Sequence, residues 1–176
     1  SLDLAGEVVD KVDVRLRATE PILRTITADN LSARIDLSRA PLGEQYVQMT
    51  PEMIRAPGGA EVASINPDRI ELRIEKRVRR EVPIVAEFAG QTPRGYHKAR
   101  HVIEPPTAQI EGPESEVFKV TRATAGTIHL NGETGDYEVQ VTPIPDAPPG
   151  SHVRIVWPQG AVRVVVSIQP LEPEGR

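Results

Sequence analysis

The residues with the greatest potential for chemistry are two histidines and a carboxylate that lie close together in the sequence. His97 and His101 are four residues apart, and Glu104 follows three residues later. Two imidazoles and a carboxylate can bind zinc when one face of a helix presents them together. Gly95 and Pro105 bound this segment, however, and two cationic side chains between the histidines would repel a metal ion. We therefore interpret both histidines as exposed residues at the point where a loop enters a strand.

The other residue types offer no frame for catalysis. None of the serines stands in the sharp elbow that a Ser-His-Asp site requires, and Ser115 is better explained as a helix cap. Gly58-Gly59 is too short for a phosphate-binding loop and opens no helix, which indicates a hairpin turn. The sequence contains no cysteine, which excludes disulfides, thiolate metal sites and a cysteine nucleophile. We predict a protein that is not an enzyme and that has no cofactor and no metal ligands.

The charge distribution argues against nucleic acid and leaves one basic segment as a candidate interaction surface. The formal net charge is −4 and the pI is about 5.6, whereas domains that bind nucleic acid are usually basic. A polyanion, an anionic membrane surface or an acidic partner could use the basic segment. Interspersed glutamates also allow the simpler interpretation of a solvated strand face that protects a sheet edge. The candidate residues are Arg73, Lys76, Arg77, Arg79 and Arg80.

The elements that would position these residues are predicted to be short β-strands. Seventeen prolines and 13 glycines are spread between short apolar runs, a distribution typical of many strands and turns. Apolar residues alternate along residues 12–16, 70–74 and 162–166, which is the period of a strand with one buried face. Short helical turns are expected after Thr19 and at Ser115. The fold class predicted is all-β, with one short helical turn in each half.

An internal repeat predicts two tandem domains. Ile35-x-Leu37 matches Ile128-x-Leu130, and four further blocks match in the same order at offsets of 91 to 93 residues. Two copies indicate a duplication, because solenoids need three or more units. Alternation continues from residue 70 to residue 88 without a glycine, so the last strand of the first copy is expected to pass directly into the second copy. The predicted boundaries are 1–79, 80–171 and a tail at 172–176.

The order of motifs in the second copy resembles the YbbR-like domain family. This copy has a Val-Pro opening strand, a Gly-Tyr after a polar loop, a proline at a strand start, a Gly-Pro-Glu strand end and an Ile-x-Leu strand. The first copy carries Ile-Asp-Leu-Ser, which is closer to the family's pattern. The residues that carry the resemblance are Pro83, Gly95, Tyr96, Pro105, Gly112, Pro113, Ile128 and Leu130, with Ile35 and Leu37 in the first copy.

The first copy departs from the family pattern at its start. Ala18-Thr19 stands where Gly-Pro is expected, and the opening strand and Gly-Tyr loop are missing before Leu2. We therefore expect the sequence to begin inside its first domain. That domain is then either incomplete or borrows a strand.

The resemblance implies a function that the residues themselves do not show. YbbR-like domains are small all-β modules carried in tandem outside the bacterial cytoplasmic membrane, usually after one membrane-spanning helix. The best-known members regulate the membrane-bound diadenylate cyclase that makes cyclic di-AMP. The expectation is a non-catalytic, extracytoplasmic module with a protein partner, and with its membrane anchor outside this sequence. The alternatives are a structural or adhesive module of the cell envelope, or a module that binds a polyanion or ligand through residues 69–80. Neither the oligomeric state nor the partner follows from the sequence.

Overall fold

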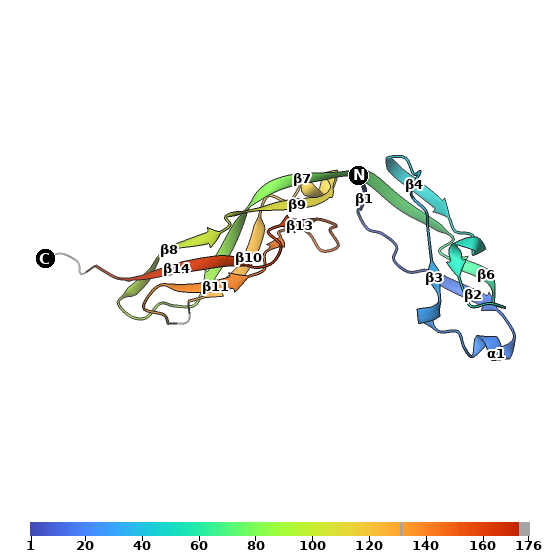
Figure 1. The fold of residues 1–176 in the computed structure, drawn as a ribbon, viewed down its shortest axis with the longest axis horizontal. Coiled ribbons are helices and arrows are strands. Elements are labelled where there is room, and N and C mark those ends of the chain that lie inside the picture. Colours follow the sequence, from blue (N-terminus) through green and yellow to red (C-terminus); the bar gives the residue numbers. More distant parts are fainter. Residues whose placement is uncertain (131, 173–176) are drawn as a thin grey trace. The chain divides into compact units, whose positions relative to one another are not determined.

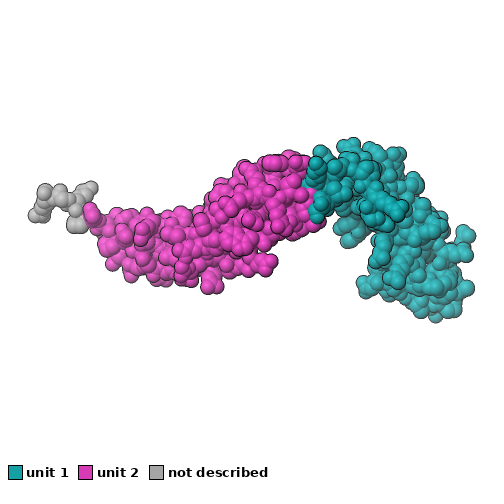
Figure 2. Space-filling model, turned by 45° about the horizontal axis from the view of Figure 1, so that its top comes forward, with its two compact units in different colours: residues 1–76 teal, residues 77–176 magenta. Residues whose placement is uncertain are grey.

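Strand β7 (Arg69–Ala89) is the longest element of the computed structural model, which describes residues 1–130 and 132–172. The chain divides into two compact units, residues 1–76 and residues 77–176, coloured separately in Figure 2. Strand β7 supplies its first residues to unit 1 and the remainder to unit 2. It is the continuous alternating segment that the sequence predicts for the join, and it contains no glycine.

Unit 1 contains short strands and a few single turns of helix (Figure 1). The strands preceding β7 are β1 (Leu2–Ala5), β2 (Asp13–Arg17), β3 (Ser32–Ala33), β4 (Gly43–Gln48), β5 (Ile54–Arg55) and β6 (Glu61–Asn66). The helical turns are α1 (Glu20–Leu23) and the 3-10 turns Ala28–Asn30 and Pro51–Met53. Strands β1 and β4 both pair with β7, whereas β2–β6 and β3–β5 form separate two-stranded sheets.

Unit 2 contains the strands that follow β7. These are β8 (Tyr96–Glu104), β9 (Thr107–Pro113), β10 (Ala123–His129), β11 (Tyr137–Val141), β12 (Ile144–Pro145), β13 (Arg154–Trp157) and β14 (Val162–Pro170). One sheet has the order β12-β10-β7-β9-β13, and a second has the order β11-β14-β8. Strand β7 runs antiparallel to β9 along residues 77–83 and then parallel to β10 along residues 84–89. Helix α2 (Glu114–Val117) follows β9 directly.

The same strand pairings occur in both units, in the order that the internal repeat requires. In unit 1, β2 pairs with β6, β3 with β5, and β4 and β1 with the first part of β7. In unit 2, β9 pairs with β13, β10 with β12, and β11 and β8 with β14. The predicted all-β class is confirmed. The assignment of unit 1 to the same family as unit 2, and the predicted domain boundaries, stay predictions, and residues 173–176 of the predicted tail lie outside the described residues.

The two units differ in how completely their cores are closed. Sixteen hydrophobic residues form the buried cluster of unit 2, and Ala108, Ile110 and Val164 among them are fully buried. The corresponding cluster in unit 1 contains four, namely Met49, Ile54, Ile70 and Leu72. Aliphatic side chains supply nearly all of this packing, and burying each large one contributes about 1.5–3 kcal/mol. The described part of unit 1 therefore buries much less apolar surface than unit 2.

The predicted helical turns exist, but the cap assignments need correction. Thr19 does occupy the N-cap position of α1, yet its side chain makes no capping hydrogen bond. Ser115 is not a cap, because α2 begins at Glu114 and its N-cap position is Pro113. Pro113, whose ring fixes its backbone φ, thus stands at the position where the sequence suggested a side-chain cap, and no side chain caps α2. None of the helices among the described residues has the length and apolar character needed to cross a membrane.

Gly112 lies where a loop packs directly on strand β9. A methyl group at this position would lie 3.1 Å from the carbonyl oxygen of His152 and 3.1 Å from the Cα of Val153. Both neighbours are backbone atoms, so they cannot rotate away as a flexible side chain would. The close approach explains why this position requires glycine.

We predict that Gly112→Ala destabilises unit 2 by about 1–3 kcal/mol, because the added methyl group forces a backbone shift in a packed region. Urea unfolding followed by the fluorescence of Trp157, the sole tryptophan, measures the change. Gly135→Ala is the matched control, since nothing lies within 4 Å of its added methyl group. Equal stability of the two variants would show that the loop can move without cost.

Candidate interaction surface

The candidate site is the outer face of three neighbouring strands of unit 2, β7, β9 and β13. Cross-strand neighbours place Arg79 opposite Glu111 and Glu111 opposite Arg154. Side chains directly opposite one another project on the same face of a sheet. One row of charge therefore crosses all three strands, with an acidic residue at its centre.

Glu111 is buried although it is a carboxylate, with only 6% of its surface exposed. Arg79 donates a hydrogen bond to it at 2.6 Å, Arg154 donates a second to its other oxygen, and Nε of Arg77 lies 3.9 Å away. The hydrogen bond from Arg79 lowers the pKa of Glu111 most, and the positive charges of Arg154 and Arg77 act in the same direction against burial. The carboxylate is thus held ionised by arginines from both flanking strands.

The arginines of this row remain partly exposed, and an aromatic residue lies on the same face of the sheet. The side chains of Arg79 and Arg154 are 67% and 50% exposed. Trp157 is 46% exposed and lies opposite Gln109, which is opposite Glu81 of β7, so it belongs to the same face. Nearly half of the surface of Trp157 therefore faces solvent.

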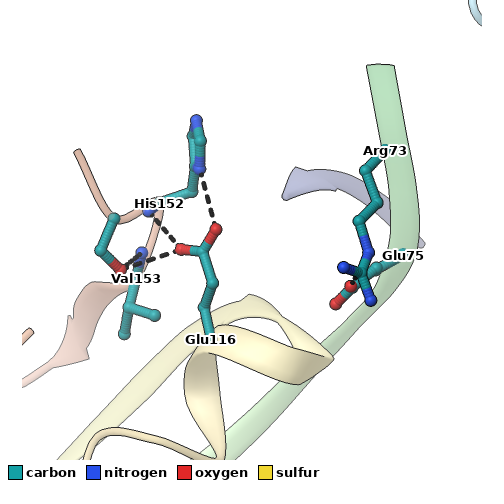
Figure 3. Close-up of polar contacts among 6 residues, drawn as sticks. Arg73, Glu75, Glu116, His152 and Val153 are labelled. Atoms are coloured by element: carbon teal, nitrogen blue, oxygen red, sulfur yellow. Dashed lines mark hydrogen bonds and ion pairs between the residues drawn. The ribbon is translucent and has the colours of Figure 1, made fainter. Parts of the chain in front are cut away.

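A second contact fixes strand β13, which carries Arg154 and Trp157, against the rest of unit 2. Glu116 of helix α2 accepts hydrogen bonds from the backbone N–H of His152 at 2.6 Å and from the hydroxyl of Ser151 at 2.9 Å (Figure 3). Nδ1 of His152 lies 3.2 Å from the other carboxylate oxygen. The loop that leads into β13 is therefore held by one carboxylate.

The predicted basic residues are divided between the two units and, within unit 2, between the two faces of β7. Arg73 and Lys76 belong to unit 1, where Arg73 pairs with Glu75 at 2.8 Å (Figure 3). Arg77 and Arg79 face Glu111, as described above. Arg80 is on the opposite face of β7, where its guanidinium lies near the ring and the carbonyl oxygen of Phe118. The role of these residues in binding stays a prediction. Arg154 joins Arg77 and Arg79 from a distant part of the chain, and no local signal in the sequence marks it.

The family-signature residues are mostly structural. Gly95 has a φ of +89°, a conformation that favours glycine, immediately before β8 begins at Tyr96. Pro105 lies between β8 and β9, Pro83 is an exposed residue of β7, and Pro113 ends β9. The buried or half-buried apolar members are Ile128 and Leu130 in the core of unit 2, and Ile35 and Leu37 in unit 1.

The histidines that could have formed a metal site lie apart along β8. Residues four apart in a strand are separated by about 13 Å, which is too far for His97 and His101 to share an ion. The amine of Lys98 lies 3.2 Å from Nδ1 of His101, and burial followed by the charge of Lys98 lowers the pKa of this histidine. Glu104 pairs with Arg163 instead. In the part of the chain that the structure describes, no group of three such side chains could hold a metal ion.

The state of Glu111 predicts how the stability of unit 2 depends on pH. The folded-state pKa lies below the usual value of 4.5, so the ionised carboxylate stabilises the fold above that pH, and this contribution is lost as the pH falls through the lowered pKa. We expect the free energy of unfolding to fall between about pH 6 and pH 3, and to fall less in Glu111→Gln. Denaturant unfolding at a series of pH values measures this. Glu81 is an exposed residue on the same face, so Glu81→Gln is the control and should keep the wild-type pH dependence. If the free energy of unfolding depends on pH in the same way in the wild type and in Glu111→Gln, the lowered pKa of Glu111 is contradicted.

The hydrogen bonds that Glu116 accepts predict that unit 2 becomes less stable when this acceptor is removed. Glu116→Ala removes the carboxylate and leaves the part-buried N–H of His152 and the hydroxyl of Ser151 without their acceptor, which should cost about 1–3 kcal/mol. Hydrogen exchange at residues 151–157 should accelerate in the same variant. Glu114→Ala truncates an exposed glutamate of the same turn of α2 and is the control. If both variants unfold at the same denaturant concentration, the contact does not hold the loop.

Two solved structures are similar to this chain, and the first of them has the same fold. A crystal structure of a YbbR-like protein from Streptococcus pneumoniae TIGR4 has a TM-score of 0.61 and 17% sequence identity, over 97% of this chain and 87% of that chain. A solution structure of the protein SuR18C from Streptococcus thermophilus has a TM-score of 0.45 and 13% identity, over 57% of this chain and 92% of that chain.

The sequence comparisons identify the family directly. No curated protein matches this sequence at a significant level. The family model described as YbbR-like protein matches residues 82–169, which is half of the chain and nearly all of unit 2. The chain therefore belongs to the YbbR-like protein family.

Proposed function

We propose that this chain is a non-catalytic protein-interaction module of a membrane-anchored bacterial regulator. It acts outside the cytoplasmic membrane, and its partner is a membrane-bound diadenylate cyclase, whose synthesis of cyclic di-AMP it modulates. Membership of the YbbR-like family supports the class of function. The observation that carries the proposal is the exposed face at strand β13, where an aromatic side chain lies on the same face as two arginines.

The chemistry of this face suits a protein partner. Tryptophan and arginine are enriched among the residues that contribute most to protein–protein affinity. Trp157 and Arg154 lie on β13, which is an edge strand because it pairs only with β9 among the described strands. An edge strand has unpaired backbone groups to which an extended segment of a partner can add. Side-chain anchors and a strand edge without a second ladder partner are thus present on one element.

The charges favour a protein partner over a polyanion. The buried carboxylate of Glu111 lies between Arg79 and Arg154 and accepts hydrogen bonds from both. A phosphate or sulfate group would have to compete with this carboxylate for the same guanidinium groups. A neutral or mixed-charge protein surface can contact the outer edges of these arginines without displacing it.

We expect the intracellular level of cyclic di-AMP to change when the full-length polypeptide that carries these residues is co-expressed with a membrane diadenylate cyclase of the same organism. The same polypeptide without residues 1–176 should not cause the change. Trp157→Ala should reduce the effect, since it removes the aromatic anchor from β13. Mass-spectrometric quantification of cyclic di-AMP, with circular dichroism to verify folding, measures the outcome.

A matched control distinguishes the loss of this contact face from the loss of any exposed apolar side chain. Val102 lies on β8 of the second sheet of unit 2 and is 46% exposed, as Trp157 is. Val102→Ala should leave the cyclic di-AMP response unchanged. Equal cyclic di-AMP levels in cells with the intact polypeptide, with the truncated one and with the cyclase alone would exclude cyclase regulation and favour a structural role in the cell envelope.

A further inference from the structure

The turn that ends helix α2 presents an aromatic side chain to solvent. Phe118 is 62% exposed, the highest fraction among the large hydrophobic residues in the part of the chain that the structure describes. It is the C-cap residue of α2 and does not belong to the buried cluster of unit 2. Val117 and Val120 on either side of it are buried. These valines fix the turn to the core, whereas the ring of Phe118 faces water.

The internal repeat shows that the fold does not need an aromatic residue at this position. Helix α1 is the equivalent of α2, since it follows β2 as α2 follows β9, and both strands pair with equivalent partners. The C-cap residue of α1 is Arg24, the equivalent of Phe118. Arg24 is exposed and pairs with Glu20. A charged side chain therefore ends the same turn in unit 1, and packing does not explain the exposed ring of Phe118.

Two cationic side chains flank this ring. The guanidinium of Arg80 lies 6.0 Å from the centre of the Phe118 ring and donates a hydrogen bond at 3.4 Å to the carbonyl oxygen of the same residue. Lys119 is the next residue in the chain, and both cations are exposed. No ion pair among the described residues neutralises Arg80 or Lys119, unlike the arginines that bind Glu111. Both charges are available to an anion outside the chain.

The acidic groups near this turn offset only part of the positive charge. The carboxylate of Glu116 points toward the loop at residues 151–152 and accepts its hydrogen bonds there (Figure 3). Asp146 forms an ion pair with Arg122 at 2.6 Å, so these two charges balance each other. Glu114, at the start of α2, is an exposed carboxylate on the same turn. The two cations beside the ring therefore outnumber the exposed acid.

We propose that Arg80, Phe118 and Lys119, here called the Phe118 surface, contact the anionic lipid bilayer beside which the module is held. This inference rests on the membrane attachment in the proposed function. An aromatic ring flanked by lysine and arginine enters the boundary between headgroups and acyl chains, while the cations bind the lipid phosphates. Long cationic side chains reach the headgroups while their methylene groups stay beside the apolar ring.

The size of the Phe118 surface favours a bilayer over a protein partner. One exposed ring at the end of a four-residue helix offers far less than the roughly 1,000 Å² that a stable protein interface buries. A bilayer accepts a single inserted side chain, and each cation near an anionic leaflet strengthens binding about fivefold. Such a contact is weak for a free protein. It is sufficient for a tethered one, because the tether keeps the module at a high effective concentration beside the lipid.

The contact leaves the proposed protein-binding face accessible. Arg80 is opposite Ile110, and Trp157 is opposite Gln109, the adjacent residue of β9. Successive residues of a strand point to opposite faces of the sheet. Lipid bound at Arg80 therefore lies on the other side of the sheet from Trp157.

The test holds the complete chain on vesicles through an N-terminal hexahistidine tag and a nickel-chelating lipid. The chain has no cysteine, so Thr121→Cys provides one exposed site, three residues after Phe118, for a nitrobenzoxadiazole probe. Brominated acyl chains should quench the probe on vesicles of equal parts phosphatidylglycerol and phosphatidylcholine. Quenching should be absent on vesicles of phosphatidylcholine alone, and it should be lost in about 1 M salt, where the screening length is about 3 Å.

Substitutions in the Phe118 surface should weaken this contact by predictable amounts. Phe118→Ser should lower the ratio of lipid-bound to unbound module about tenfold, because the ring no longer leaves water. Arg80→Gln and Lys119→Gln should each lower it about fivefold. Glu114→Gln should raise the ratio, since it removes a charge that repels the anionic lipid.

Matched controls come from exposed residues elsewhere in unit 2. Val102→Ser removes an exposed apolar side chain from β8, and Arg94→Gln removes an exposed cation from the loop before β8. Both variants should keep the wild-type quenching. Circular dichroism verifies that every variant is folded.

Three results would overturn the proposal. The first is a probe that stays unquenched on the anionic vesicles, and the second is quenching that Phe118→Ser and the charge variants leave unchanged. The third is unchanged lipid contact together with a weaker cyclic di-AMP response in Phe118→Ser, which would assign the Phe118 surface to a protein partner. The vesicles contain no cyclase, so the lipid result is independent of whether this chain regulates one.

Discussion

The backbone hydrogen-bond ladder along β7 is the interaction on which unit 2 depends. Without this strand, β9–β13 and β10–β12 would be two separate pairs, and isolated two-stranded sheets are marginally stable in water. With it, the two pairs become one sheet over a continuous apolar core. Unit 1 shows the same pairs without the joining strand, and its buried cluster is correspondingly small.

The charged residues of unit 2 are arranged around this ladder. Once β7, β9 and β13 lie side by side, Glu111 is covered by its neighbours and loses most of its contact with water. Ionising such a group is unfavourable unless nearby charges and hydrogen bonds compensate for the lost hydration. Arg79 and Arg154 provide that compensation from the two flanking strands. Part of the basic character seen in the sequence is therefore used within the fold, and only the outer surfaces of these arginines remain for a partner.

Strand β13 connects the packing of unit 2 with its proposed function. The glycine at position 112 allows the preceding loop to approach β9, and Glu116 holds that loop through its backbone and side chains. The exposed Trp157 is thereby presented from a supported strand rather than from a free loop. A side chain held in this way loses little conformational freedom on binding, which favours its use as a contact residue.

The sequence by itself determined the class of structure, the repeat and the family, because these depend on local patterns. Alternating apolar residues predict a strand from a short segment alone. The order of the Val-Pro, Gly-Tyr and Ile-x-Leu motifs can likewise be read along the chain without knowing which residues are in contact. It did not determine which charges meet, because Glu111 and Arg154 are 43 residues apart and only the pairing of β9 with β13 brings them together. Nor did it show that Glu111 is buried, or that Trp157 lies on the same face as Arg154. Those features depend on strand register and on neighbours distant in the chain, which the tertiary structure alone decided.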